Sequence, residues 1–316
     1  MGIVIENESV LAEISSHGAE LCRLYDKLNG RELLWNADPA FWNRHAPILF
    51  PFVGKVNGGK YRYQGKAYSM GQHGFARDME FELSGSSAQE VTFVLKDTPE
   101  TLEKYPFRFE LTVTHRLEGR TLQVLWQVKN PSETEPLYFS IGGHPAFLCP
   151  PPGLEGVKKE DCQVRLCGFA GGKKQYVLID PETEAVAADK PLYLDERAEM
   201  IRQEAGDKNA VLLKTEESLF TGDALIFDDG QIREASLCLP DGKPYITLCC
   251  PDFPSFGLWS KPNAGAPYIC LEPWDGRCDN RGLTGELPEK YGELCLKPGS
   301  VYEKGYQIVV EGCAEQ

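Results

Sequence analysis

The sequence lacks the features that mark several large classes of protein. It has no apolar run that approaches the roughly 20 residues of a membrane-spanning helix. Its first residues lack the basic and long apolar segments of a secretory signal. We therefore expect a cytoplasmic protein without a membrane partner. Low-complexity tracts, obvious repeats and Pro/Ser-rich linkers are also missing, which predicts one domain over residues 1–316.

An excess of positive charge is missing too. The 33 Lys and Arg residues stand against 47 Asp and Glu residues, which gives a net charge of −14 at pH 7. A field of this sign repels phosphate backbones and anionic membrane surfaces, so no nucleic-acid partner is expected. It also disfavours a strongly anionic substrate, unless a local cluster of Arg and Lys overrides the global field.

Motifs for metals and phosphates are absent. The 11 cysteines show no C-x-x-C spacing and several lie in apolar stretches, which predicts reduced, buried thiols rather than zinc or disulfide roles. The segment PILFPFVGK does not have the spacing of a phosphate-binding P-loop. Asp228 and Asp229 resemble a polar turn more than a calcium loop, because the alternating oxygen ligands are missing.

Alternation with period two dominates what is present. In FRFELTVTHRL (residues 107–117) the odd positions are mostly apolar, and TLQVLWQVKN continues the pattern after a turn at 118–120, which predicts an antiparallel hairpin. Similar short strands are predicted at residues 4–5, 11–14, 61–63, 81–83, 91–95, 245–250 and 306–310. Helical signals are few: TEESLF, with Thr215 as its N-cap, and residues 195–205. The predicted fold class is an all-β sandwich, with the Pro-rich break at residues 150–153 as a loop.

Two strand-like segments carry polar side chains opposite an apolar face. In FSIGGHPAF, His144 shares a face with Ser140 and Gly142 and points away from the apolar core. In APYICLEPWDG, Glu272 and Trp274 share a face, and a carboxylate beside an indole suits the hydroxyls and the apolar face of a sugar. Taken singly, His144 could equally be a turn histidine and Glu272 a salt-bridged strand residue.

A third segment, GQHGFARD, contains His73 between two glycines and is followed by Arg77. The glycines permit close approach of a ligand, although an ordinary turn is the alternative. The other histidines have simpler explanations. His115 lies on the apolar face of its strand and is expected to be a core or edge residue, while turns and packing explain His17 and His45.

Taken in order, PILFPFVGKVNGGKY, QHGFAR, SIGGHPAF and LEPWDG resemble the aldose 1-epimerase (galactose mutarotase) family. The match is closest to the bacterial branch linked to lactose-utilisation operons and spans nearly the whole chain. The resemblance implies a large twisted antiparallel β-sandwich with an open cleft that binds a monosaccharide.

The resemblance also implies roles by motif position. His144 corresponds to the catalytic acid, Glu272 to the catalytic base and His73 to the sugar-binding histidine. Asp223, in TGDALIF, corresponds to an aspartate that binds a hydroxyl, and Lys55 stands where galactose-specific members carry an arginine. Arg77 and Trp274 complete the expected substrate-binding set.

The chemistry of anomerisation defines what these residues must do. Ring opening needs a base that removes the proton of the C1 hydroxyl and an acid that protonates the ring oxygen, so the two are expected on opposite sides of one small region. Glu272 would be the base and protonated His144 the acid, since imidazole has an unperturbed pKa near neutrality. Rotation about C1–C2 before closure yields the other anomer, and no cofactor or metal is needed.

Two alternatives stay open. A hexose-6-phosphate 1-epimerase would need a basic cluster at the cleft, for which Lys55, Lys60 and Arg77 are available. A carbohydrate-binding or sensing protein would do no chemistry, but binding alone would not demand an acid paired with a base. The sequence names neither the sugar nor the oligomeric state, for which a monomer or a homodimer is expected.

Overall fold

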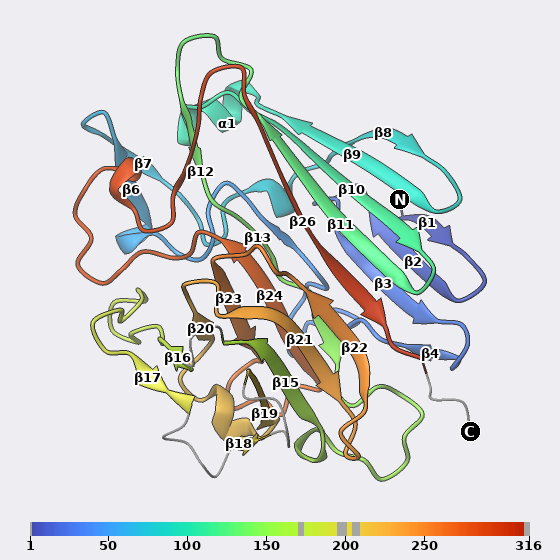
Figure 1. Ribbon diagram of the computed structural model, residues 1–316. Helices are drawn as coiled ribbons and strands as arrows, with labels where there is room; N and C mark the ends of the chain where they lie inside the picture. The colour runs from blue at the N-terminus through green and yellow to red at the C-terminus, as the bar shows by residue number, and fades with distance from the viewer. Residues whose placement is uncertain (1, 170–173, 195–200, 204–208, 313–316) are drawn as a thin grey trace.

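The computed structural model describes residues 2–169, 174–194, 201–203 and 209–312. Strands predominate within these residues and the helices are short (Figure 1). This confirms the all-β fold class. No helix in the described ranges is long and apolar enough to cross a membrane.

The largest sheet has ten antiparallel strands within the described residues, in the order β18-β19-β15-β21-β22-β26-β11-β10-β9-β8. The strands are β8 (Glu82–Ser86), β9 (Glu90–Lys96), β10 (Glu110–Glu118), β11 (Thr121–Lys129), β15 (Gln163–Gly168), β18 (Ile201–Gln203), β19 (Ala210–Lys214), β21 (Ile232–Cys238), β22 (Pro244–Cys249) and β26 (Val301–Val310).

The predicted hairpin forms the centre of one half of this sheet. β10 and β11 pair from Glu110 opposite Lys129 to Glu118 opposite Thr121, and Gly119 takes a positive φ of 56° in the turn. Their side chains alternate between buried and partly exposed, as period two predicts. His115 is buried, and its Nε2 lies 3.0 Å from the carbonyl oxygen of Ala19, which confirms its place in the core.

A second layer covers this half of the large sheet. It is a four-stranded sheet of β1 (Gly2–Glu6), β2 (Val10–Ser15), β3 (Leu21–Asp26) and β4 (Arg31–Glu32) among the described residues. In Figure 1 its blue strands lie behind the cyan and green strands β8 to β11. Buried residues of both sheets, such as Ile14 and Leu24 on one side and Phe93 and Leu111 on the other, share one apolar core. The packing of two sheets is the sandwich that the alternation predicts.

The sheet that positions the site has the order β20-β23-β24-β13-β5, with β14 also paired to β24. Its strands are β5 (Ile48–Leu49), β13 (Ile141–Gly143), β14 (Ala146–Leu148), β20 (Leu225–Phe227), β23 (Ser255–Trp259) and β24 (Tyr268–Asp275). Every residue of β24 is buried. Ile269 and Leu271 point into the main core, whereas Tyr268 and Cys270 belong to a separate apolar cluster on the other face.

The remaining elements are short. Two-stranded pairings join β6 (Lys60–Tyr63) to β7 (Lys66–Ser69), β12 (Leu137–Phe139) to β25 (Leu294–Leu296) and β16 (Gln175–Tyr176) to β17 (Leu192–Tyr193). The helices are α1 (Pro99–Lys104) and the 3₁₀ turns η1 (Asn57–Gly59), η2 (Ala76–Asp78), η3 (Lys159–Asp161), η5 (Glu217–Phe220) and η6 (Leu287–Glu289).

Both helix predictions need correction. Residues 201–203 form strand β18, so that part of the predicted helix 195–205 is wrong; residues 195–200 and 204–205 lie outside the described residues. TEESLF does contain a helix, but it is the 3₁₀ turn η5, which Glu216 precedes without a side-chain cap. Thr215 instead donates its hydroxyl to the carbonyl oxygens of Lys159 and Cys162, because long-range contacts compete with local capping.

The predictions of cysteines without disulfides and of a polar turn are confirmed within the described residues. None of the ten cysteines there is in a disulfide, and most are buried; the absence of a zinc role stays a prediction. Asp229 adopts a positive φ of 62° in a turn, and the carboxylate of Asp228 pairs with the guanidinium of Arg277 at 2.9 Å. Residues 150–153 form the expected loop between strands.

Candidate active site

A break in one strand places His144 opposite Glu272. On one side of the break Gly142 in β13 pairs with Trp274 in β24, and on the other Ala146 in β14 pairs with Cys270. The register is the same on both sides, so His144, between the two segments, lies opposite Glu272. Directly opposed residues on one face of a sheet have neighbouring side chains.

The two side chains meet as this register requires. Nε2 of His144 lies 3.2 Å from Oε2 of Glu272, and both side chains are more than nine-tenths buried. His144 does lie on the face away from the main core, as alternation predicts, but other side chains cover that face too. The acid and the base were expected on opposite sides of the reacting centre. They are adjacent instead, because neighbouring strands carry them.

Three aromatic rings enclose His144. The indole of Trp42 lies over the imidazole, with ring centres 4.7 Å apart and an angle of 31° between the planes. Trp259 and His73 approach edge-on, each with its ring centre 5.6 Å away. These contacts limit the rotation of the imidazole and remove it from water.

Local backbone geometry orients His73. Its φ is +66°, in the left-handed region, and its backbone N–H donates to the carbonyl of Gly54 at 2.8 Å. The backbone N–H of Gly54 in turn donates to Nδ1 of His73 at 3.1 Å. An Nδ1 that accepts a hydrogen bond leaves the ring hydrogen on Nε2, which makes Nε2–H the donor available to a ligand. Gly74 is required here, since a Cβ on it would lie 2.3 Å from the carbonyl oxygen of Phe50.

Trp274 fits between two glycines. A Cβ on Gly142 would lie 2.6 Å from Cδ1 of the indole, and a Cβ on Gly257 would lie 2.5 Å from Cζ2. Neither glycine has a positive φ, so space for the ring, and not backbone freedom, explains them. Gly142 lies in β13 and Gly257 lies in β23, the two strands that flank β24. The indole of Trp274 therefore reaches over both strands next to its own.

All seven residues predicted from the sequence line one cleft of about 800 Å³. They are Lys55, His73, Arg77, His144, Asp223, Glu272 and Trp274. The volume is within the range of about 300–1,000 Å³ that is usual for small-molecule sites. Lys60, considered for a basic cluster, lines a different and smaller hollow instead.

The polar residues at the cleft differ in how they are held. Lys55 pairs with Glu184 at 2.5 Å and stays partly exposed. The guanidinium of Arg77 donates to the carbonyl of Gln72 at 2.8 Å. Asp223 has a φ of +68° and accepts the backbone N–H of Ala224 at 2.9 Å.

The sequence analysis missed much of the cleft wall. Trp42, Asn43 and Arg44 line it, together with residues such as Gln72, Ile179, Asp180, Glu184, Thr221, Trp259 and Pro262. Segment 42–46 is held by the carboxylate of Glu20, whose Oε1 accepts the backbone N–H groups of His45 at 2.7 Å and Ala46 at 2.9 Å. A tryptophan two residues before an arginine in WNRHAP is a weak signal for a ligand site. Long-range contacts place them there, among them the donation of Trp35 to the carbonyl of Trp42 and the pairing of Arg44 with Asp78.

Burial shifts the pKa values of the central pair in opposite directions. Desolvation, followed by the negative charge of Asp223, raises the pKa of Glu272 well above its ordinary range. Desolvation lowers the pKa of His144 to about 3. Both shifts favour the neutral form of each side chain, so the unperturbed pKa of imidazole that the sequence-based argument used does not apply to this buried pair. Oε2 of Glu272 lies 3.2 Å from Nε2 of His144 but is not aligned with it as a hydrogen bond, and it has no hydrogen-bond partner among the described residues.

Burial also lowers the pKa values of the basic groups beside the pair. Burial lowers the pKa of His73 well below its ordinary range, and the nearby His144 and Arg77 add to the effect. Burial and the charge of Arg44 lower the pKa of Arg77 to about 10. Nε of Arg77 is buried and has no hydrogen-bond partner among the described residues.

One set of side chains in the cleft has the composition of a metal site. A ring nitrogen of His144, the thiol of Cys270 and a carboxylate oxygen of Glu272 lie within 4.8 Å of one another. Such ligands suit zinc. The reaction expected for this site needs only an acid and a base, and the absence of a metal from it stays a prediction.

Comparisons with known proteins agree with this geometry. The model of the family described as aldose 1-epimerase matches residues 1–307. The chain belongs to the aldose 1-epimerase family. Protein LacX of Lactococcus lactis subsp. lactis, in its chromosomal form, is 31% identical over 320 residues, which cover 98% of this chain and 99% of LacX.

Two solved structures are similar over almost their whole length. The galactose mutarotase related enzyme from Lactobacillus acidophilus has a TM-score of 0.86 at 32% identity, over 99% of this chain and 98% of that one. A galactose mutarotase-like protein from Lactobacillus casei has a TM-score of 0.85 at 32% identity, over 98% and 100% of the two chains. This aldose 1-epimerase family member is an isomerase with the mutarotase-like β-sandwich fold.

Proposed function

We propose that this protein is a mutarotase that interconverts the α and β anomers of an aldohexose, with Glu272 and His144 as its catalytic pair. The observation that carries the proposal is the contact between these two side chains, whose nearest atoms lie 3.2 Å apart in the cleft. Glu272 on β24 lies opposite His144, which stands between β13 and β14. His73 lies beside them with its ring-nitrogen donor available to a ligand.

Adjacency of the two groups suits the reaction. Ring opening moves one proton off the C1 hydroxyl and another onto the ring oxygen. Both oxygens are bonded to C1, so two neighbouring side chains on one side of the sugar reach both. General acid and base catalysis each contribute about 10²- to 10⁴-fold when the groups are positioned in this way.

The protons balance over one cycle. Sugar hydroxyls solvate the carboxylate of Glu272, which lowers its pKa and moves its proton to His144 across the 3.2 Å contact. Glu272 then accepts the proton of the C1 hydroxyl while His144 protonates the ring oxygen; the C1–O5 bond breaks and C1=O forms. After rotation about C1–C2, O5 attacks C1, returns its proton to His144, and Glu272 reprotonates O1.

The surrounding residues bind and orient the sugar in this proposal. Nε2–H of His73 donates to a sugar oxygen, because Nδ1 is already used by Gly54. Trp42 and Trp259 line the cleft and are partly exposed, so they offer the apolar surface on which a pyranose stacks, whereas Trp274 is only 4% exposed and shapes the wall beneath. Asp223 accepts and Lys55 donates hydrogen bonds to hydroxyls at the more open part of the cleft.

The first test compares wild type with Glu272→Gln. The decay of optical rotation of freshly dissolved α-D-glucose and α-D-galactose is followed without phosphate or metals. Because the amide cannot accept the C1 proton, we expect the catalysed rate to fall by about 10²- to 10⁴-fold. Glu80→Gln, at an exposed carboxylate paired with His17, is the matched control and should keep the wild-type rate.

Near-wild-type mutarotation by Glu272→Gln would refute the assigned role. Sugar binding without any acceleration by the wild type would instead support a carbohydrate-binding or sensing protein.

A second candidate substrate is a phosphorylated hexose, and one observation favours it. Arg44 and Arg77 both line the cleft, close enough for the charge of Arg44 to lower the pKa of Arg77. The carboxylate of Asp78 lies 2.7 Å from the guanidinium of Arg44 and 3.8 Å from Nε of Arg77, so it already balances part of their charge. A phosphate would bind these two arginines in competition with Asp78, and charged hydrogen bonds to both would have to outweigh that pairing.

The two substrates are separated by comparing the rate with a free hexose and with its 6-phosphate. If the phosphate is the substrate, Arg77→Gln should lower kcat/KM for the 6-phosphate by at least about 10-fold and leave the free hexose nearly unaffected, because loss of a charged hydrogen bond costs about 1.5–3 kcal/mol. Equal loss with both compounds would count against a phosphate subsite at Arg77.

A further inference from the structure

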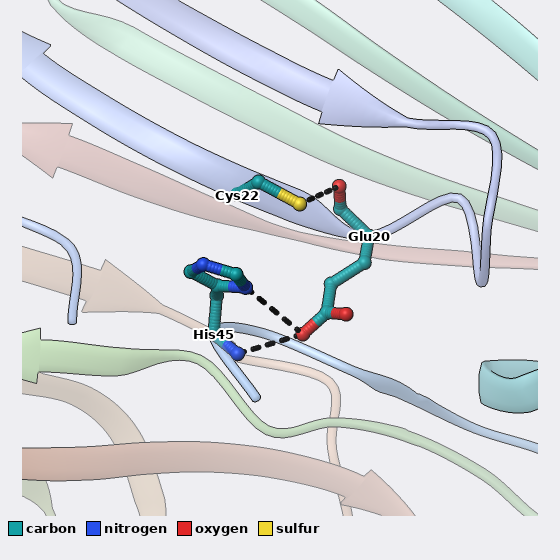
Figure 2. A group of neighbouring side chains, drawn as sticks. All are labelled: Glu20, Cys22 and His45. Carbon is teal, nitrogen blue, oxygen red and sulfur yellow. Dashed lines mark hydrogen bonds and ion pairs between the residues drawn. The ribbon is translucent and has the colours of Figure 1, made fainter. Parts of the chain in front are cut away.

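A second group of metal-ligand side chains lies outside the sugar cleft. The carboxylate of Glu20, the thiol of Cys22 and the imidazole of His45 place one ligand atom each within 4.8 Å of the others. Figure 2 shows the three side chains turned toward one another from two segments of the chain. Glu20 immediately precedes β3, and Cys22 lies at a register shift between β2 and β3, where Glu13 pairs with Arg23 and Ile14 with Leu21. Such a bulge re-aims side chains, and here it leaves Cys22 beside Glu20.

The distances fit a small tetrahedral ion. At the usual zinc bond lengths, two ligands of a tetrahedral site lie about 3.3–3.8 Å apart. Nδ1 of His45 already lies 3.8 Å from Oε1 of Glu20. The sulfur of Cys22 lies within 4.8 Å of the other two ligand atoms, and its thiol donates to the backbone oxygen of Glu20 at 3.3 Å, a hydrogen bond that an ion would replace.

The ligands are held in place before any ion binds. Oε1 of Glu20 also accepts the backbone N–H groups of His45 and Ala46, at 2.7 and 2.9 Å. Such outer contacts orient metal ligands and raise affinity. The side chain of Glu20 is only 9% exposed, whereas that of His45 is 24% exposed. The site is therefore rigid on one side and open to a water molecule on the other.

The donor set selects the kind of ion. A thiolate and an imidazole with one carboxylate favour zinc over magnesium or calcium, which prefer oxygen ligands alone. The thiolate and the carboxylate together balance the charge of a divalent cation. The cysteines have no zinc-finger spacing, so the set becomes visible only when the fold brings Cys22 and His45 together.

We propose that Glu20, Cys22 and His45 bind one Zn²⁺ ion, with water as the fourth ligand. The site is separate from the sugar chemistry and does not depend on the proposed mutarotase activity. His45 follows Arg44, so the ion would sit behind the segment that carries Trp42 and Arg44 to the cleft wall.

The test uses the full chain after treatment with a chelator and Co²⁺ as a spectroscopic probe. Wild type is expected to bind one Co²⁺ with a near-ultraviolet thiolate-to-cobalt band that Zn²⁺ abolishes by displacement. Cys22→Ser should lose the band and bind at least about 10-fold more weakly. His45→Gln, whose fold is checked by circular dichroism, should also weaken binding and tests the site without altering the thiol.

Cys270→Ala is the decisive control, because Cys270 belongs to the other candidate ligand set, in the cleft. The band should survive in this variant. Two outcomes overturn the proposal: folded wild type that binds no stoichiometric Co²⁺, or a band that disappears in Cys270→Ala and persists in Cys22→Ser.

Discussion

At the scale of single residues, burial decides the chemistry of the cleft. Glu272 and His144 are both desolvated, which raises the pKa of the carboxyl, lowers the pKa of the imidazole and so favours the neutral form of each. A neutral pair has the same protonation as the open-chain intermediate of the proposed cycle. Ring opening therefore needs the proton to move to His144 first, and a bound sugar that solvates Glu272 favours this transfer.

His73 offers a residue-scale prediction that separates binding from folding. In His73→Asn, the side-chain oxygen takes the position of Nδ1 and can still accept the N–H of Gly54, and Asn tolerates the positive φ of this position. The donor at the Nε2 position is lost. We expect kcat/KM for the preferred hexose to fall by about 10- to 100-fold, because one hydrogen bond to the sugar disappears.

The measurements are steady-state polarimetry and thermal unfolding. The melting temperature should stay close to that of wild type, since the contact with Gly54 is kept. His73→Ala, which loses both contacts, should show the same kinetic defect together with lower stability. If His73→Asn retained full kcat/KM, the donor role of His73 would be wrong.

At the scale of elements, the register between β13, β23 and β24 reserves space for the indole of Trp274. Adding a methyl group at Gly257 would place Cβ 2.5 Å from the ring. Overpacking of this kind costs about 1–3 kcal/mol. We therefore expect Gly257→Ala to lower the free energy of unfolding by this amount and to reduce kcat/KM, because the indole must shift from its position at the cleft.

Gly85→Ala is the matched control for that variant. Gly85 also lies in a strand, β8, but a Cβ there meets no atom within 4 Å. Its stability should change by no more than about 0.5 kcal/mol. Urea unfolding and mutarotation kinetics on both variants test the idea, and equal behaviour of the two would show that the space beside Trp274 is not tightly specified.

Local patterns predicted elements well where the stabilising contacts are themselves local. The hairpin of β10 and β11 follows from alternation and a turn at Gly119, and the opposed faces of Ile269 and Glu272 follow from period two. Thr215 shows the limit. Its sequence neighbours suggest a cap, but the carbonyls of Lys159 and Cys162 take its hydroxyl after the chain folds.

At the scale of the whole molecule, long-range contacts determine what the sequence could not reveal. In the ten-stranded sheet of the described residues, β11 pairs with β26, although the paired residues are far apart in the chain. No local pattern specifies that pairing. The cleft shows the same division. The motif resemblance predicted His73, His144 and Glu272 as site residues. Arg44 was not predicted, because distant residues hold it: Glu20 binds the backbone of the two residues that follow it, and Asp78 pairs with its guanidinium.

The free energy of unfolding should depend on pH through the buried histidines. Among the buried histidines of the described residues, His115 lies outside the cleft. Its Nε2–H donates to Ala19, and Nδ1 is buried without a partner among the described residues. Desolvation lowers the pKa of His115 from 6.5 to about 4. Between these values the unfolded chain binds a proton that the folded protein does not, so stability rises with pH across this window and is lost as the pH falls.

His115→Gln isolates this contribution, because its amide nitrogen can replace the Nε2–H donor while the titrating group is removed. Other groups, such as Glu272 with its raised pKa, oppose the histidines, so the difference between the two proteins is the quantity to measure. From pH 6 to pH 4.5 we expect wild type to lose up to about 1.4 kcal/mol per pH unit relative to His115→Gln in urea unfolding. His17→Gln, at an exposed histidine, controls for removing an imidazole from the unfolded chain. Parallel curves for wild type and His115→Gln from pH 7 to pH 4.5 would mean that the pKa of His115 is the same in the folded and unfolded protein, against the lowering that its burial predicts.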